Sequence, residues 1–242
     1  EERINWTLSA SFKHQKAKYE DIGNSLDQFN KENLNTSLVR YYDGGSPTAL
    51  WAVRSLGINP SDGRELFLTK EGTYTFEYDT EDEVVVGNSE PKLEGVLGST
   101  LYWKGFSFSL YFRYSLGADV FTEATYNKVE NISLAGLKSN QDKRALHDRW
   151  QKPGDHAKFK GISLTETTPI SSRFVLRENY IKAESISVGY DFESQAVQKL
   201  GIQSLRLQAN TTDLFRISSI KEERGIEYPF ARSFSFSLSA MF

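Results

Sequence analysis

Segments in which apolar and polar residues strictly alternate recur along the chain and constrain its fold more than any other feature. Two of them, residues 95–103 and 106–115, flank the dipeptide Lys104-Gly105. A two-residue connection that contains glycine is typical of a tight β-hairpin, and a period of two is that of a strand with one apolar face. Such a hairpin would place Trp103 and Phe106 on the same face. The sequence therefore predicts an all-β fold of antiparallel strands.

The alternation predicts six strands of about ten residues, at about 4–14, 95–103, 106–115, 180–191, 204–213 and 232–242. Ten residues tilted by about 45° are long enough to cross a bilayer. The long connections, at about 15–94, 116–179 and 214–231, alternate with two short ones. Outer-membrane barrels combine long extracellular loops with short periplasmic turns. The pattern therefore predicts a transmembrane antiparallel β-barrel segment in the cell outer membrane, with three extracellular loops.

The aromatic residues, 13% of the chain, are concentrated in these alternating segments. The apolar face of the strands should contact outer-membrane lipid, with aromatic girdles at the bilayer surfaces. The candidates for this lipid face and its girdles are Trp6, Trp103, Phe106, Phe108, Phe112, Phe234, Phe236 and Phe242. The opposite, polar face should line the lumen or pack against a plug. Its candidates are Tyr111, Arg113, Arg206, Gln208 and Asn210.

Composition and motifs exclude several other classes of protein. The chain has 29 basic and 32 acidic residues, a net charge of -3, so no surplus of positive charge favours nucleic acid. It has no cysteine, the acidic run from Asp79 to Glu83 lacks the spacing of a calcium loop, and no nucleophile elbow G-x-S-x-G is present. We therefore expect no enzyme, no cofactor and no metal site. A soluble β-sandwich carbohydrate-binding module is the alternative, although its strands are usually shorter.

Six strands are too few to close a membrane barrel. The smallest single-chain barrels have about eight strands, and each unpaired backbone group at an open edge in lipid costs several kcal/mol. The chain also starts at Glu1 without an initiator Met or a signal sequence. We therefore expect residues 1–242 to be the C-terminal part of a larger barrel, whose sheet is completed by an upstream segment or another chain.

Three segments carry a resemblance to a known family. They read RYYDGGSPTALWAVRSLGINPSDGRELFL (residues 40–68), VVVGNSEPKLEGVLGSTLYWKGFSF (residues 84–108) and YPFARSFSFSLSAMF (residues 228–242). Together they resemble the C-terminal part of the SusC/RagA family of TonB-dependent outer-membrane transporters. One departure is Leu93, where the family usually has an aromatic residue before Glu94-Gly95.

The resemblance implies a barrel of roughly 22 strands with a plug domain, of which this chain would supply the last six strands. It also implies three partners: an N-terminal barrel and plug segment absent from this chain, a SusD-like lipoprotein, and TonB, which contacts the absent segment. Such complexes import oligosaccharides or peptides. A SusC-like barrel repurposed as the scaffold of a larger outer-membrane assembly is the alternative within this resemblance.

Five residues of the first long loop are candidates for contact with a ligand or with the lipoprotein lid: Tyr41, Tyr42, Trp51, Arg54 and Arg64. The aromatic side chains could stack on a sugar or a peptide, or they could pack a small core within the loop itself. The arginines flank the turn dipeptides Asn59-Pro60 and Asp62-Gly63, which predict a rigid loop element.

Overall fold

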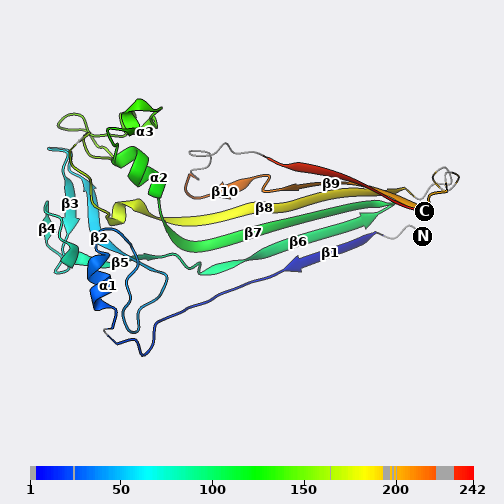
Figure 1. Cartoon of the computed structure of the whole chain (residues 1–242), viewed down its shortest axis with the longest axis horizontal. Helices are drawn as coiled ribbons and strands as arrows, with labels where there is room; N and C mark the ends of the chain where they lie inside the picture. The colour runs from blue at the N-terminus through cyan, green and yellow to red at the C-terminus, as the bar shows by residue number, and fades with distance from the viewer. Residues whose placement is uncertain are drawn as a thin grey trace. The chain divides into compact units, whose positions relative to one another are not determined.

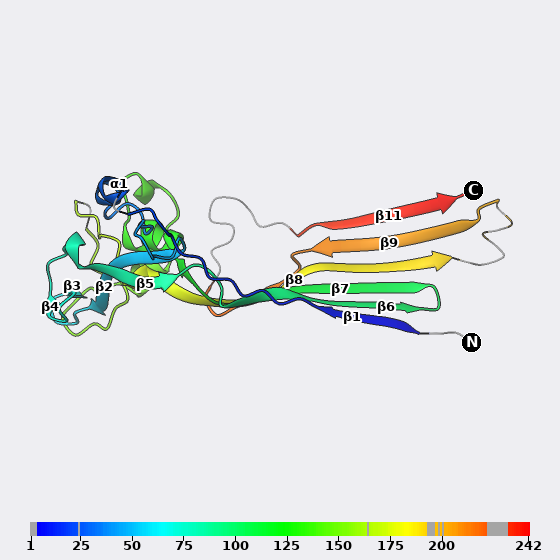
Figure 2. The ribbon, with the colours of Figure 1, turned by 90° about the horizontal axis from the view of Figure 1, so that it is seen from below.

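The computed structural model describes residues 4–23, 25–163, 165–192, 197, 199, 201–221 and 232–242. The chain divides into two units, which are described separately (Figures 1 and 2). The sheet unit comprises Glu1–Gln15, Pro91–Gly117 and Glu178–Phe242, and the loop unit comprises Lys16–Glu90 and Ala118–Arg177. The fold is predominantly β with antiparallel strand pairs, as predicted.

The sheet unit is one seven-stranded sheet with the strand order β1-β6-β7-β8-β9-β11, and β10 pairs with β8 (Figure 2). The strands are β1 (Asn5–Ala10), β6 (Leu93–Trp103), β7 (Phe106–Phe121), β8 (Val175–Phe192), β9 (Ser204–Thr212), β10 (Arg216–Ser218) and β11 (Phe234–Met241). β7 and β8, with 16 and 18 residues, extend well beyond the alternating segments of the sequence. Residues 118–121 of β7 and 175–177 of β8 belong to the loop unit.

The predicted hairpin between β6 and β7 is present. Trp103 pairs with Phe106, and the two connecting residues, Lys104 and Gly105, have φ angles of 50° and 81°. Two successive positive φ angles define the type I′ turn, whose twist matches that of the flanking strands. The register places Leu97 opposite Phe112 and Leu101 opposite Phe108. Trp103 and Phe106 therefore share one face.

The apolar face continues across the other strands of the sheet. Leu101 lies between Trp6 and Phe108, and Leu207 lies between Tyr190 and Leu238. The rings of Phe106 and Tyr190, 4.5 Å apart, join the two halves. Of the predicted girdle residues, Phe108 and Phe112 are partly buried and the others are exposed: Trp6, Trp103, Phe106, Phe234, Phe236 and Phe242.

The polar face carries hydrogen bonds and ion pairs between neighbouring strands. Arg206 donates to Asp191 at 2.6 Å, and Arg113 donates to Glu184 at 2.7 Å. The Gln208 amide donates to Ser187 and to Asn210, both at 2.9 Å. Four of the five predicted lumen residues thus take part in polar contacts. The fifth, Tyr111, is exposed and packs over Gly98, where an added Cβ would lie 2.7 Å from the ring.

The alternation on β8 changes face along the strand. Ile181 pairs with Ile217, and Ile186 pairs with Thr211. The two isoleucines are an odd number of positions apart along the strand. A regular strand would place these two isoleucines on opposite faces. Ile181 instead lines an apolar depression of about 580 Å³ with Leu97, Tyr114 and other residues of the apolar face. The shift places polar residues of this part of β8 in ion pairs: Glu178–Arg216, Lys182–Asp213 and Glu184–Arg113.

The sheet has two open edges. Among the described residues, β1 pairs only with β6, and β11 pairs only with β9. The pairing of this chain segment with β6 continues beyond Ala10, because the amide of Lys13 donates to Glu94 O at 2.7 Å. Both edge strands are exposed along their whole length. An edge strand presents unpaired backbone groups that can pair with another strand.

The loop unit contains a four-stranded sheet with the order β4-β3-β2-β5 and several short helices. Its strands are β2 (Ala49–Ile58), β3 (Glu65–Leu68), β4 (Tyr74–Thr75) and β5 (Glu83–Asn88). Its helices are α1 (Asp27–Glu32), η1 (Thr80–Asp82), α2 (Glu123–Thr125), η2 (Tyr126–Glu130), η3 (Gly136–Lys138), α3 (Arg144–His147) and η4 (Ser172–Phe174). In the part of the chain that the structure describes, no helix is long and apolar enough to cross a membrane.

Two of the predicted loops fold into this one unit. A small core combines Leu38, Leu50 and Ala52 from the first loop with Ile170 from the second. The Tyr78 hydroxyl donates to Ile170 O at 3.2 Å. Arg173 is bound to two buried carboxylates, Glu65 at 2.9 Å and Glu130 at 3.0 Å. Buried charges are stable only when they are paired in this way.

The Asp62-Gly63 turn is held against the second loop by Trp150. The indole Nε1 donates to Pro60 O at 3.0 Å, and a Cβ on Gly63, whose φ is +73°, would lie 2.5 Å from the ring. We expect Gly63→Ala to destabilise this contact by more than the ~1–2 kcal/mol that a left-handed backbone costs an alanine, because the ring must also move. Hydrogen exchange of residues 59–64 in the full-length protein should accelerate by more than about tenfold.

Gly72→Ala is the matched control for this prediction. Gly72 has a φ of +86° and no neighbouring atom within 4 Å of an added Cβ. Its substitution therefore tests backbone strain without the clash. Equal acceleration of local hydrogen exchange in the two variants would show that the packing of Trp150 contributes nothing.

Candidate functional site

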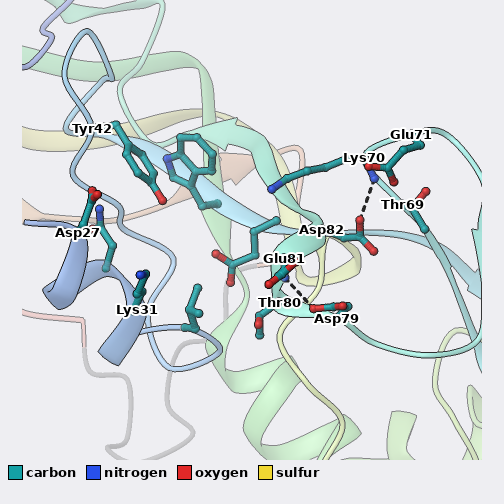
Figure 3. A pocket seen from close by; sticks show the side chains of 14 residues that line it. Asp27, Lys31, Tyr42, Thr69, Lys70, Glu71, Asp79, Thr80, Glu81 and Asp82 are labelled. Carbon is teal, nitrogen blue, oxygen red and sulfur yellow. Dashed lines mark hydrogen bonds between the residues drawn. The ribbon is translucent and has the colours of Figure 1, made fainter. Parts of the chain in front are cut away.

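A polar cavity in the loop unit is the best-formed candidate site. It has a volume of about 650 Å³ and opens between α1, the start of β2, the β3–β4 turn and η1 (Figure 3). Fourteen residues line it: Asp27, Asn30, Lys31, Leu34, Tyr42, Trp51, Thr69, Lys70, Glu71, Asp79, Thr80, Glu81, Asp82 and Glu83. Cavities of several hundred Å³ are the usual size of sites for small ligands.

Two aromatic side chains form one wall of the cavity. The rings of Tyr42 and Trp51 lie 5.2 Å apart with an interplanar angle of 56°. The backbone of Trp51 is held by β2, where its amide donates to Leu38 O at 2.7 Å and the residue pairs with Val85. Tyr42 remains exposed. The pair therefore offers an aromatic surface on a rigid support.

Carboxylates dominate the rest of the lining. Six of the fourteen lining residues are acidic and two, Lys31 and Lys70, are basic. The η1 segment is ordered by its own side chains, because Asp79 accepts from the Glu81 amide and Asp82 accepts from the Lys70 amide, each at 2.9 Å (Figure 3).

Glu83 differs from the other lining carboxylates because it is buried and paired. It forms a two-pronged ion pair with Arg40, whose Nε and Nη2 lie 2.9 and 2.8 Å from its two oxygens. Burial raises the pKa of the Glu83 carboxyl, and the Arg40 guanidinium opposes this rise. The pair anchors β5 to the segment before β2 and leaves the remaining carboxylates to set the charge of the cavity.

The five loop residues predicted to contact a ligand or a lid lie in different places. Tyr42 and Trp51 line the cavity. Tyr41 packs between the rings of Tyr19 and Phe29, with centroids 5.5 and 5.6 Å away. Arg54 donates to Thr69 O at 2.9 Å. Arg64 pairs with Asp62 at 2.7 Å and lies over the Phe76 ring at 4.1 Å. Their roles in contacting a ligand or lid stay predictions.

Sequence reasoning missed most of the acidic lining. The run from Asp79 to Glu83 lacks the spacing of a calcium loop and matches no other motif considered in the sequence. Asp27 and Glu71 belong to no motif either. Within the described residues, no group of three or more His, Asp or Glu side chains is arranged to hold a metal ion. The one available sequence signal for the acidic lining was local, since Glu71 and the run 79–83 lie near a tight turn. The α1 residues join this lining only in the folded unit.

The comparisons with known proteins agree with the fold and with the resemblance seen in the sequence. No family model matches the chain. TonB-dependent receptor P39 of Formosa agariphila is 24% identical over 161 residues, which are 65% of this chain and 15% of the relative. TonB-dependent receptor P3 of the same organism is 25% identical over 173 residues, 72% of this chain and 16% of the relative. The chain is related to TonB-dependent receptors.

Solved structures extend the similarity to the three-dimensional fold of this chain. The RagAB peptide transporter superposes with a TM-score of 0.70 and 16% identity, over 90% of this chain and 24% of that chain. The RagAB peptide importer in the open-open state superposes with a TM-score of 0.73 and 16% identity, over 99% and 27%. The chain thus spans about a quarter of these transporters and less of the curated receptors. These relatives are named as receptors and transporters, not as enzymes.

Proposed function

We propose that this chain is the C-terminal part of an outer-membrane β-barrel that imports nutrients. The exposed apolar face of the sheet unit carries the proposal. It is lined by side chains such as Trp6, Leu8, Phe236 and Leu238, all more than half exposed. An apolar surface of this extent is unstable in water and is stable in lipid. The opposite face, with its ion pairs, would then line the lumen.

The two open edges of the sheet support completion by other strands. In lipid, the unpaired backbone groups of β1 and β11 would each cost several kcal/mol. We propose that the N-terminal strands of the same transporter pair with both edges and close a barrel of roughly 22 strands. The similarity to receptors of which this chain covers only 15% and 16% supports this arrangement.

The family resemblance supports the rest of the function. We propose that a SusD-like lipoprotein lies over the loops, that the substrate is an oligosaccharide or a peptide, and that TonB drives import through the absent plug segment. The RagAB neighbours are described as a peptide transporter and a peptide importer. We propose no enzymatic activity for this chain.

The test uses the full-length protein, tagged at a loop and expressed in its own host. We expect it in the outer-membrane fraction, soluble only in detergent and co-purifying with a lipoprotein. Deletion of its gene should abolish growth on one class of oligosaccharide or peptide, and deletion of TonB should do the same. Co-purification with secretion or assembly proteins, with nutrient uptake unchanged, would support the scaffold alternative. A monodisperse protein without detergent would refute the barrel.

A further inference from the structure

The charge and shape of the loop-unit cavity together favour a positively charged organic group as its ligand. The cavity is large enough, at about 650 Å³, for a long side chain and the peptide groups next to it. Figure 3 shows Tyr42 on one side and Asp79, Glu81 and Asp82 on the other, with the Lys70 side chain extending toward the aromatic side. A bound group would therefore meet an aromatic surface and carboxylates at once.

The aromatic wall is suited to an organic cation. The face of an aromatic ring attracts an ammonium or guanidinium group within about 6 Å of its centroid. Tyr42 and Trp51 come from separate segments, and their rings pack against each other with centroids 5.2 Å apart and an interplanar angle of 56°. They therefore present one aromatic surface that a cation in the cavity can approach. An aromatic wall offers no ligand to a bare metal ion, which needs several oxygen atoms.

The carboxylates supply the complementary charge. Within the described residues, Asp27, Glu71 and Glu81 have no ion-pair partner; Glu71 and Glu81 are exposed at the cavity and Asp27 is partly buried. Asp79 and Asp82 accept only backbone amides. A sugar requires hydrogen-bond partners but no net charge, whereas this lining has five acidic residues besides the paired Glu83 and only two basic ones. The surplus favours a positively charged ligand over a neutral one.

We propose that this cavity binds the lysine or arginine side chain of an oligopeptide, between the Tyr42–Trp51 wall and the carboxylates of the β3–β4 turn and η1. The inference rests on the proposed function in treating the peptide as cargo on its way to import. Binding itself is independent of import and can be measured without it.

The test is calorimetric titration of the detergent-solubilised full-length protein with four probes: trilysine, triserine, triglutamate and maltotriose. Trilysine should bind, and its affinity should fall steeply as salt is added. The double variant Glu71→Gln/Glu81→Gln should weaken trilysine binding by about tenfold, because two attractive charges are lost. Glu166→Gln, an exposed acid of the same unit outside the cavity, should leave the affinity unchanged.

The aromatic wall is tested by a second pair of variants. Tyr42→Leu should weaken trilysine binding about threefold to tenfold, and Tyr74→Leu, which removes an exposed tyrosine outside the cavity, should not. Equal binding of trilysine and triserine, preference for maltotriose, or an unchanged affinity in both cavity variants would overturn the inference. If trilysine does not bind while peptide uptake is intact, this inference fails and the proposed function stands; loss of both the membrane location and uptake refutes the proposed function.

Discussion

Leu110→Arg should prevent the protein from reaching the outer membrane. Leu110 lies midway along the predicted spanning segment 106–115 of β7, opposite Ser99 and on the apolar face that Leu97 and Phe112 share. An arginine facing lipid at the bilayer midplane costs about 2–4 kcal/mol, and the barrel must also assemble through that state. We expect the full-length variant to be depleted from the outer-membrane fraction and degraded. Quantitative immunoblotting of membrane fractions measures this result.

Ser109→Arg is the matched control for the facing of β7. Ser109 is the adjacent residue, lies opposite Thr100 and belongs to the polar face. An arginine there would extend into the wet lumen, beside Tyr111 and Arg113, and we expect near-normal amounts in the membrane. Equal outer-membrane levels of the two variants would refute the assigned faces. Depletion of Ser109→Arg alone would show that the lipid-facing and lumen-facing sides of β7 are the reverse of those assigned.

Arg173→Met should open the loop unit. The substitution keeps much of the side chain's volume but removes the partner of Glu65 and Glu130, whose side chains are 2% and 0% exposed. Leaving a buried charge unpaired costs about 3–5 kcal/mol. Hydrogen exchange across β2, β3 and η2 in the full-length protein should accelerate by at least about a hundredfold, because 1.4 kcal/mol corresponds to a factor of ten.

Two further variants separate the loss of charge from the loss of packing. Arg64→Met removes an exposed ion pair with Asp62 and should leave hydrogen exchange across the unit nearly unchanged, because exposed pairs contribute little to stability. Adding Glu65→Gln and Glu130→Gln to Arg173→Met should recover part of the protection, since neutral amides are cheaper to bury than carboxylates. Exchange in Arg173→Met that matches Arg64→Met would show that the buried pairs contribute little.

The sheet unit shows which elements can be predicted from local sequence. The β6–β7 hairpin was predictable because the turn residues and the alternation of both strands all lie within residues 95–115. The facing of β8 around Ile181 was not predictable, because the shift in alternation between Ile181 and Ile186 depends on pairing with β9 and β10. The pairing of Glu184 with Arg113, across 71 residues, depends on the same shift.

Local sequence was enough to establish the β character, the tight turn at Lys104-Gly105, and the apolar and polar faces of the strands other than the first part of β8. Backbone geometry imposes the period of two on every strand, so this information is local. Long-range folding brings Lys16–Glu90 and Ala118–Arg177 into one unit, and places α1, Trp51 and η1 around a single cavity. These features depend on contacts such as Arg173 with Glu65, 108 residues apart. No local pattern encodes contacts of this kind, because they form only when distant segments are buried together.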